Sequence, residues 1–363
     1  FGYTVTNYLG NNVFNMPYAA LPQGKNSVDD FIPVARVSDM LLNPGQTFEY
    51  DGQQYAYPDI DLVYWAGGNP FHHHQDLSRM RKAWEKPSTI IVNDWFWNAL
   101  ARYADIVLPC TTPLERQDIG MNPRDPFVIS MEKAIEPVGK ARDDYEIFSA
   151  IARQMNAGDA FTEGRSADDW QRWIWEKSSE NAAALDVSMP TYESFRKACF
   201  YKSPDLAEDR IFLSDFFEDP VANPLGTPSG KIEIFSQTVD NFNYDDCRGH
   251  PIWLEPVEWL GTPDKRYHLH LLSNQPRNKL HSQMDNGQHS LSIKIKGHEP
   301  IEINPNDAKA RNISDGAIVR VFNDRGACIC GAYVTEDVMP GVVIISTGSW
   351  YDPDDPADRT SMC

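Results

Sequence analysis

The chain has 363 residues, with 52 Asp and Glu against 33 Lys and Arg, which gives a formal net charge of −19. This negative balance argues against general binding to nucleic acid, because phosphate contacts require clustered cations. A hydrophobic content of 41% and an aromatic content of 12% indicate a globular chain, and the length allows two or three domains. No run approaches the roughly 20 apolar residues that span a bilayer, so we expect no insertion into a membrane.

The first 60 residues are rich in Gly, Asn and Pro and show little periodicity, so we expect loops with one short helix within 33–45. The chain begins at Phe1 without a methionine, and no signal peptide is visible. We therefore expect that a preceding part was removed and that residues 1–60 are the tail of an upstream domain.

From residue 61, short apolar runs alternate with segments of helical spacing. Strands are expected at 62–66, 88–92 and 106–109, and helices at 74–86 and 96–103. This alternation predicts parallel strands joined by helices, as in a Rossmann-like α/β domain. A further strand at 127–131 and a helix at 142–155 are expected to continue the same unit.

Residues 160–262 are less regular. Trp170, Trp173, Trp175 and Phe195 indicate packed helices, and Asp168-Asp169 suits a helix start. The alternating run 231–235 predicts a strand that follows a turn at 227–230.

From residue 263 the composition favours β-structure. Short strands are expected at 267–272, 291–296, 300–303, 317–322, 327–334 and 342–346, with a helix at 307–311 and a hairpin turn at 323–326. Short strands at this density predict a compact barrel. The predicted domains are therefore a loop-rich tail (1–60), a Rossmann-like domain with a helical insertion (61–262) and a β-barrel domain (263–363).

Polar residues follow the predicted parallel strands where a ligand would bind. Gly67-Gly68-Asn69-Pro70 ends the first strand, Asn93-Asp94 ends the second, and Thr111 to Asp118 follows the third. Glycines let backbone N–H groups approach a phosphate, and a carboxylate at the next strand end suits ribose hydroxyls or a guanine edge. The pattern is not G-x-G-x-x-G, so a plain βα turn with an Asp helix cap stays open as the alternative.

Three consecutive histidines, His72-His73-His74, suggest a metal at first sight. Consecutive helical residues point about 100° apart, so the three rings cannot all face one ion. A helical N-terminal turn in which one histidine touches a nucleotide fits better. The six cysteines are scattered without zinc spacing, so we interpret them as plain thiols that do not reveal the compartment.

The stretch 273–283 contains almost only hydrogen-bonding side chains. Such a stretch is costly to bury without a polar partner. A surface loop is one explanation, and a polar heterocyclic ligand with phosphates is the other.

Together these motifs resemble the bis-molybdopterin guanine dinucleotide enzymes of the dimethyl sulfoxide reductase family. The branch they are most similar to is that of dimethyl sulfoxide, trimethylamine N-oxide and biotin sulfoxide reductases. The resemblance rests on blocks spread in order over nearly the whole chain: WAGGNPFHHHQD (65–76), IIVNDWFWNALARYADIVLPCTTPLERQDIG (90–120), TPSGKIEIFS (227–236), LLSNQPRNKLHSQ (271–283), INPNDAKARNISDGAIVRVFNDRG (303–326) and GSWYDP (348–353).

The resemblance implies a Rossmann-like domain followed by a double-psi β-barrel domain, both of which bind bis(molybdopterin guanine dinucleotide) with molybdenum. It implies oxygen-atom transfer from an S-oxide or N-oxide, with redox chemistry supplied by the cofactor. The implied cofactor-binding residues are Gly68, Asn69, His72, His73, Asn93, Asp94, Arg116, Asp118, Asp143, Ser273, Asn274, Gln275, Pro276, Arg277, Asn278, Lys279, His281, Ser282, Gln283, Trp350 and Tyr351.

The chain also departs from the family pattern. In this branch a serine in an earlier segment holds the molybdenum, and no counterpart of that block is found here. The chain stops at Cys363, soon after GSWYDP, where the family continues. We therefore assign no catalytic residue and no metal ligand. We expect a C-terminal part of the enzyme that is inactive without the N-terminal domains of the same polypeptide.

Two competing functions remain at this stage. One is a non-catalytic module that binds a nucleotide or cofactor, and the other is an unrelated NAD-type dehydrogenase, which the missing glycine fingerprint disfavours. The resemblance favours the periplasm, where many relatives lie, over the cytoplasm, and it implies a c-type cytochrome as electron donor.

Overall fold

The computed structural model describes residues 16–28, 31–121, 126–204, 213–263 and 265–353. Contacts between backbone positions divide the chain into two units that are each discontinuous in sequence. Unit 1 comprises Phe1–Asp29 with Leu108–Ser236, and unit 2 comprises Asp30–Val107 with Gln237–Cys363. The domain limits predicted from the sequence remain a prediction, since contact units and family domains need not coincide.

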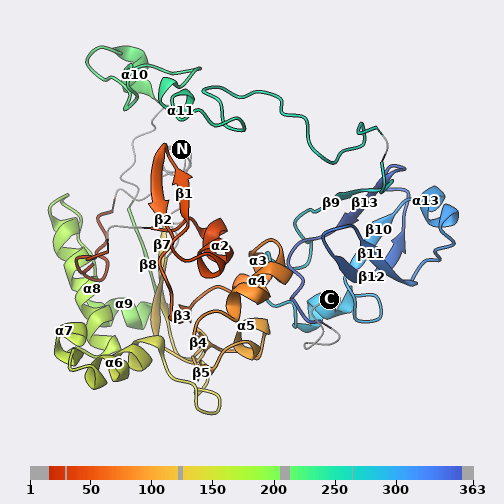
Figure 1. Cartoon of the computed structure of the whole chain (residues 1–363). Coiled ribbons are helices and arrows are strands. Elements are labelled where there is room, and N and C mark those ends of the chain that lie inside the picture. Colours follow the sequence, from red (N-terminus) through yellow and green to blue (C-terminus); the bar gives the residue numbers. More distant parts are fainter. Residues whose placement is uncertain (1–15, 29–30, 122–125, 205–212, 264, 354–363) are drawn as a thin grey trace. The chain divides into compact units, whose positions relative to one another are not determined.

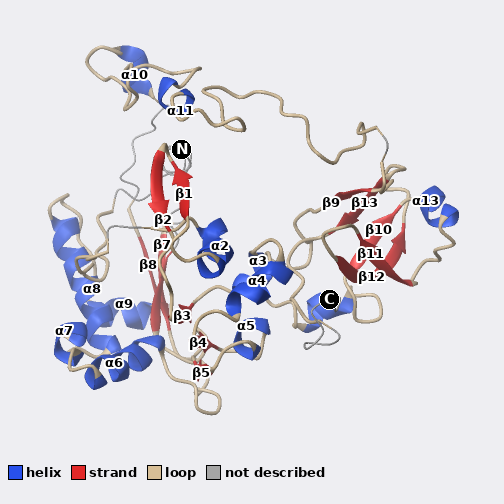
Figure 2. Cartoon of the chain, viewed as in Figure 1, coloured by secondary structure: helices blue, strands red, loops and turns tan. Residues whose placement is uncertain are grey.

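Unit 2 contains the predicted parallel sheet (Figures 1 and 2). Its N-terminal half consists of η1 (Val34–Arg36), α2 (Val37–Leu42), β1 (Thr47–Tyr50), β2 (Gln53–Ala56), β3 (Leu62–Ala66), α3 (Pro70–His73), α4 (Leu77–Trp84), β4 (Thr89–Asp94), α5 (Ala99–Arg102) and β5 (Ile106–Pro109), the last lying at the division between the units. The sheet has the order β3-β4-β5, and β3 pairs with β4 in parallel. The predicted limits of β3 and β5 are confirmed to the residue.

A buried core holds the helices against this sheet. Met80 and Trp84 of α4 pack with Ile90 and Val92 of β4 and with Leu100 of α5. These positions recur every three to four residues in α4 and every second residue in β4, as burial of one helix face and one strand face requires. The core fixes the turns after β3 and β4 at one end of the sheet.

The C-terminal half of unit 2 contains a curled mixed sheet (Figure 1). Its elements are α11 (Gln237–Asp240), β9 (His270–Leu272), α12 (Gln288–Ser292), β10 (Pro300–Ile303), α13 (Pro305–Ala310), β11 (Ile318–Phe322), β12 (Ala327–Val334) and β13 (Val342–Ile345). The strand order is β11-β12-β10-β13-β9, with parallel pairing of β10 with β12 and of β13 with β9. The predicted hairpin turn at 323–326 is confirmed, because β11 and β12 pair antiparallel on either side of it.

Unit 1 combines a small antiparallel sheet with helices. Its elements are β6 (Asp118–Met121), β7 (Phe127–Met131), α6 (Asp144–Gln154), α7 (Gly158–Thr162), α8 (Ala167–Ala183), α9 (Tyr192–Ala198), β8 (Phe200–Lys202) and α10 (Ser214–Glu218). The helix start predicted near Asp168-Asp169 is confirmed, since Ser166 and Asp169 form a capping box at α8. No helix within the described ranges is both long and apolar enough to cross a membrane.

Three sequence predictions were wrong. The strand at 127–131 does not extend the parallel sheet but pairs antiparallel with β6 and β8. The connection from Met121 to Phe127 is too short for a parallel crossover, which needs a dozen or more residues. The run 231–235 is not a strand, and Ile234 is 86% exposed, because alternation makes a strand only where a neighbouring strand pairs with it.

The third error concerns residues 291–296. The structure places helix α12 over Gln288–Ser292, followed by a tight bridge between Ile295 and His298. Lys294 lies in this connection with its ammonium 2.8 Å from Asp285 Oδ2. A tertiary charge contact has thus overridden the local β-pattern.

Candidate cofactor-binding site

The turn after β3 opens directly into a short helix. Gly67 and Gly68 have φ of +80° and +69°, which side-chain-bearing residues rarely adopt, so the turn depends on glycine. Asn69 is the N-cap of α3, and its Oδ1 accepts from the Phe71 N–H at 3.0 Å. Its amide nitrogen Nδ2 is buried and has no hydrogen-bond partner among the residues that the structure describes.

Two of the three histidines lie against this turn. His73 Nε2 accepts from the backbone N–H of Asn69 at 3.3 Å. Burial and the neighbouring His73 lower the pKa of His72 to about 4, with Asp285 opposing the shift, so His72 is neutral near pH 7. Its buried Nε2 has no hydrogen-bond partner in the described ranges. Among the residues that the structure describes, no group of three potential metal ligands gathers.

Asn93 and Asp94 are buried at the end of β4. Asn93 Oδ1 accepts from the Tyr64 hydroxyl at 2.8 Å. Asp94 accepts from the backbone N–H groups of Trp95 and Phe96 and from the Asn98 side chain, and burial raises its pKa despite these three bonds. Asp94 thus binds the turn that follows β4, while the cap of α5 is Asn98, so the structure does not show the alternative of an Asp helix cap at Asp94. Contact of Asp94 with a nucleotide remains a prediction.

Trp350 contacts both the segment after β3 and the stretch 273–283, which is the polar loop. Its ring stacks on His72, with centroids 5.0 Å apart and planes at 16°, and it also contacts Phe96. Its indole Nε1 donates to the carbonyl of Ser282 at 2.7 Å. The predicted proximity of these segments within unit 2 is therefore supported by direct contacts.

Tyr351 has a packing role that the sequence analysis did not anticipate. Its ring is buried in the core against Phe71, and its hydroxyl accepts from Arg81 Nη1 at 3.2 Å. These contacts make it a packing residue, and direct contact with a cofactor remains a prediction.

The polar loop is tied down near its start and exposed in its middle. Ser273 Oγ donates to Ile345 O, and Asn274 Oδ1 accepts from Ser346 Oγ. Pro276 is buried, Asn278 and Ser282 are half-buried, and six predicted side chains of the loop are exposed: Ser273, Asn274, Gln275, Arg277, His281 and Gln283. Both polar atoms of the Asn278 amide group are buried and have no hydrogen-bond partner within the described part of the chain.

Lys279 forms ion pairs with other residues of this chain. Its side chain is 1% exposed and its ammonium lies on the carboxylates of Asp285 and Glu299. Asp285, Lys294 and Glu299 escaped the sequence analysis, because ion pairs between separate segments leave no local pattern. The only available signal was the presence of charged residues beside short apolar runs.

Unpartnered buried atoms concentrate in the predicted site. Nine buried side-chain N or O atoms lack a partner in the described part of the chain, and four of them belong to the predicted residues Asn69, His72 and Asn278. Two more, Asn286 Oδ1 and Thr347 Oγ1, belong to residues that the sequence analysis did not single out. Buried polar groups in folded proteins are almost always hydrogen-bonded, so such a concentration indicates a polar ligand. The donors and acceptors on these residues fit a pterin or nucleotide ring, which carries both kinds of group.

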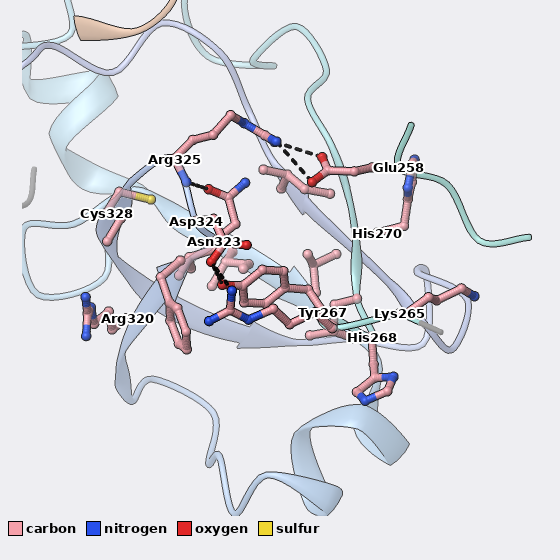
Figure 3. A pocket seen from close by; sticks show the side chains of 18 of the residues that line it. Glu258, Lys265, Tyr267, His268, His270, Arg320, Asn323, Asp324, Arg325 and Cys328 are labelled. Atoms are coloured by element: carbon pink, nitrogen blue, oxygen red, sulfur yellow. Dashed lines mark hydrogen bonds and ion pairs between the residues drawn. The ribbon is translucent and has the colours of Figure 1, made fainter. Parts of the chain in front are cut away.

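Two cavities occur in the C-terminal half of unit 2. The smaller, about 390 Å³, is lined by Asn278, Lys279 and Gln283 of the polar loop. The larger, about 1070 Å³, lies against the inner face of the curled sheet and contains no predicted site residue (Figure 3). Its floor consists of core residues such as Ile301 and Val343, and Arg325 pairs with Glu258 at its rim. We place the candidate site at the smaller cavity and at the Trp350 contacts.

The remaining predicted residues lie together in unit 1. The buried Thr111 donates from Oγ1 to Asp143 Oδ1 at 2.7 Å, and its carbonyl accepts from Arg116 Nη1 at 3.0 Å. Arg116 also pairs with Asp118 at 3.3 Å. Arg116, Asp118 and Asp143 were all predicted to contact the cofactor together with Asn69 and Asp94, and that contact remains a prediction.

A glycine turn that leads into a helix, at the end of a parallel strand, is an arrangement that many nucleotide-binding proteins use to present backbone N–H groups to an anion. Residues 4–154 match the family model for molybdopterin oxidoreductase, and residues 269–362 match the model for the molybdopterin dinucleotide binding domain. The chain belongs to the molybdopterin oxidoreductase family. These matches confirm the family and the cofactor that we predicted.

Characterised relatives agree with the predicted branch. The chain is 47% identical over 335 residues to a dimethyl sulfoxide/trimethylamine N-oxide reductase of Cereibacter sphaeroides, covering 91% of this chain and 41% of that protein. It is 46% identical to a biotin sulfoxide reductase of the same organism, covering 92% of this chain and 45% of the relative. A trimethylamine-N-oxide reductase of Haemophilus influenzae is 42% identical, covering 88% of this chain and 40% of the relative. The chain thus spans less than half the length of these relatives.

A solved structure supports the fold. Acetylene hydratase from Pelobacter acetylenicus matches with a TM-score of 0.62 at 20% identity, covering 81% of this chain and 38% of that one. The mixed α/β class with a parallel sheet and a curled sheet is therefore confirmed.

Proposed function

We propose that this chain is the cofactor-binding part of a bis(molybdopterin guanine dinucleotide) reductase that removes an oxygen atom from S-oxides or N-oxides. The observation that carries the proposal is the set of unpartnered buried atoms on Asn69, His72 and Asn278, on both sides of the Trp350 contacts. The relatives named as dimethyl sulfoxide, trimethylamine N-oxide and biotin sulfoxide reductases support the substrate class. We further propose that the curled sheet belongs to a double-psi β-barrel.

In this proposal the chain binds and orients the cofactor. Asn69 Nδ2 and the amide of Asn278 would bond polar atoms of the ligand, and the glycine turn before α3 would face an anionic group. Neutral His72 can donate or accept through Nε2 without adding a charge to the site. When bound, the cofactor supplies the redox chemistry of oxygen-atom removal.

The metal ligand and the substrate funnel would come from other parts of the polypeptide, since the chain covers 41% of its dimethyl sulfoxide reductase relative. We therefore expect residues 1–363 loaded with cofactor to show no turnover of a sulfoxide or N-oxide with a viologen donor. A longer polypeptide carrying this sequence should turn over. A non-catalytic binding module would show no turnover in either form. Periplasmic location and a c-type cytochrome donor are part of the same proposal.

Nucleotide binding by the chain itself is the direct test. We expect isothermal calorimetry to detect GDP binding, and Asp94→Ala to weaken it by about tenfold, which corresponds to one lost charge-assisted hydrogen bond. Asp76→Ala is the matched control, because Asp76 also accepts a backbone N–H, that of Arg79, and is not among the predicted cofactor-binding residues. Equal binding by the wild type and Asp94→Ala would remove Asp94 from the site, and absence of GDP binding would contradict the proposed guanine dinucleotide.

A further inference from the structure

A buried ionic network lies beneath the polar loop. The ammonium of Lys279 is 2.5 Å from Asp285 Oδ1 and 3.4 Å from Glu299 Oε2, and that of Lys294 is 2.8 Å from Asp285 Oδ2. The side chains of Lys279, Asp285 and Glu299 are 1%, 4% and 7% exposed, and that of Lys294 is 12% exposed. Two cations and two carboxylates balance, as burial of charge requires.

The same carboxylates also bind the segment that carries Trp350. The backbone N–H of Trp350 donates to Asp285 Oδ2 at 3.1 Å, and Ser349 Oγ donates to Glu299 Oε2 at 2.7 Å. Burial tends to raise the pKa of Asp285, but the bonds from Lys279 and Lys294 outweigh it and lower that pKa. The acceptor of the Trp350 N–H is therefore a permanent anion near neutral pH.

These bonds hold the indole ring of Trp350 between the ionic network and the candidate cofactor site. With its backbone N–H on Asp285 and its Nε1 on the Ser282 carbonyl, Trp350 is anchored at both ends. Its ring then lies flat against His72, whose Nε2 is one of the unpartnered buried atoms. A chain of direct contacts thus runs from the network to the surface expected to bind the cofactor.

We propose that Asp285 is a positioning residue of the cofactor site, which holds Trp350 against His72 and so preassembles the binding surface before the cofactor arrives. The inference deepens the proposed function and rests on it. Preassembly matters because a ligand that must order its own site loses part of its binding free energy to that ordering.

The experiment compares three variants of the whole chain. Asp285→Asn keeps the shape but leaves the buried network with an excess positive charge. The double variant Asp285→Asn with Lys294→Met removes one charge of each sign, so the network stays neutral and folding is protected. Asp307→Asn is the matched control, because Asp307 accepts the Gly341 N–H at 2.7 Å and has no place in the network.

The first readout is the proton NMR signal of His72 Cε1–H, assigned by its disappearance in His72→Asn. In the wild type and in Asp307→Asn we expect an upfield shift from the stacked indole ring, and in the double variant we expect that shift to be lost. Retention of the shift in the folded double variant would overturn the proposal. Loss of a ring-current shift is specific to the stack and would not follow from weaker folding alone.

The second readout is GDP affinity by calorimetry. We expect the double variant to bind about tenfold more weakly than the wild type and the control. Loss of the NMR shift with unchanged affinity would overturn the positioning role. If the wild type bound no GDP, the proposed function would fall and the positioning role with it, while the NMR signal would still show whether Asp285 orients Trp350.

Discussion

The end of β4 and the polar loop each contain a buried ionisable side chain, but neighbouring residues bond it in the first region and distant residues bond it in the second. At the strand end, Asp94 is bound by Trp95, Phe96 and Asn98, all within four residues of it. In the loop, the buried charge of Lys279 is balanced by Asp285 and by Glu299, which is 20 residues away. Because all these partners of Asp94 are close in sequence, the first region holds its shape without distant segments. The second region depends on the fold around it. The two buried carboxylates should therefore respond differently to mutation.

The largest effect is expected from Asp285→Ala. This change leaves two buried ammonium groups with one carboxylate, and breaking a buried pair costs about 3–5 kcal/mol of stability. Asp94→Ala should cost about 1–2 kcal/mol, as for the loss of a few local hydrogen bonds. Urea denaturation followed by circular dichroism measures both. Equal losses of unfolding free energy in the two variants would contradict the proposed difference between the two regions.

The next effect concerns the close approach of Gly348 to the loop. Gly348 has φ of +93°, and a Cβ there would lie 1.9 Å from the carbonyl oxygen of His281. We expect Gly348→Ala to destabilise unit 2 by about 2–4 kcal/mol through strain and forced displacement. Gly326→Ala is the control, since a Cβ at Gly326 meets nothing within 4 Å. A loss below that of the control would show that the two segments separate easily.

The pH dependence should separate the two carboxylates by sign. The pKa of Asp285 is lowered, so its contribution is present above the unfolded value of about 3.9 and is lost as pH falls through the folded pKa. The pKa of Asp94 is raised by burial, so its contribution is present below about 3.9 and is lost as pH rises through the folded pKa. Between pH 6 and pH 3, the stability difference between wild type and Asp285→Asn should therefore shrink, and that between wild type and Asp94→Asn should grow. Parallel trends would contradict both assignments.

The last prediction needs no substitution. Burial lowers the pKa of His72 from 6.5 to about 4, so the unfolded chain binds more protons than the folded chain between these values. Stability attributable to His72 should fall as pH decreases from about 6.5 to about 4. An NMR titration of the ring protons gives the midpoint directly. A midpoint near 6.5 would mean that His72 is not buried against Trp350.

The sequence correctly predicted those features of the fold that short local patterns determine. The limits of β3 and β5, the hairpin turn before β12 and the helical turn after Asn69 follow from apolar runs and turn residues. It also identified the polar loop.

What the sequence missed depends on contacts between distant segments. Residues 291–296 alternate like a strand, yet Lys294 pairs with Asp285 and the segment forms a helix and a tight bridge instead. Tyr351 was grouped with the ligand-binding residues, although its ring completes a core around Phe71. Neither outcome leaves a trace in a short window of sequence, because the partner lies elsewhere in the chain.

The bond between Arg81 and Tyr351 spans 270 residues. During synthesis at roughly 5–20 residues per second, the apolar surface of α3 and α4 would wait on the order of tens of seconds before Tyr351 emerges to cover it. The nascent chain therefore exposes the apolar part of this core that Tyr351 later covers, and a chaperone would be most useful during that interval.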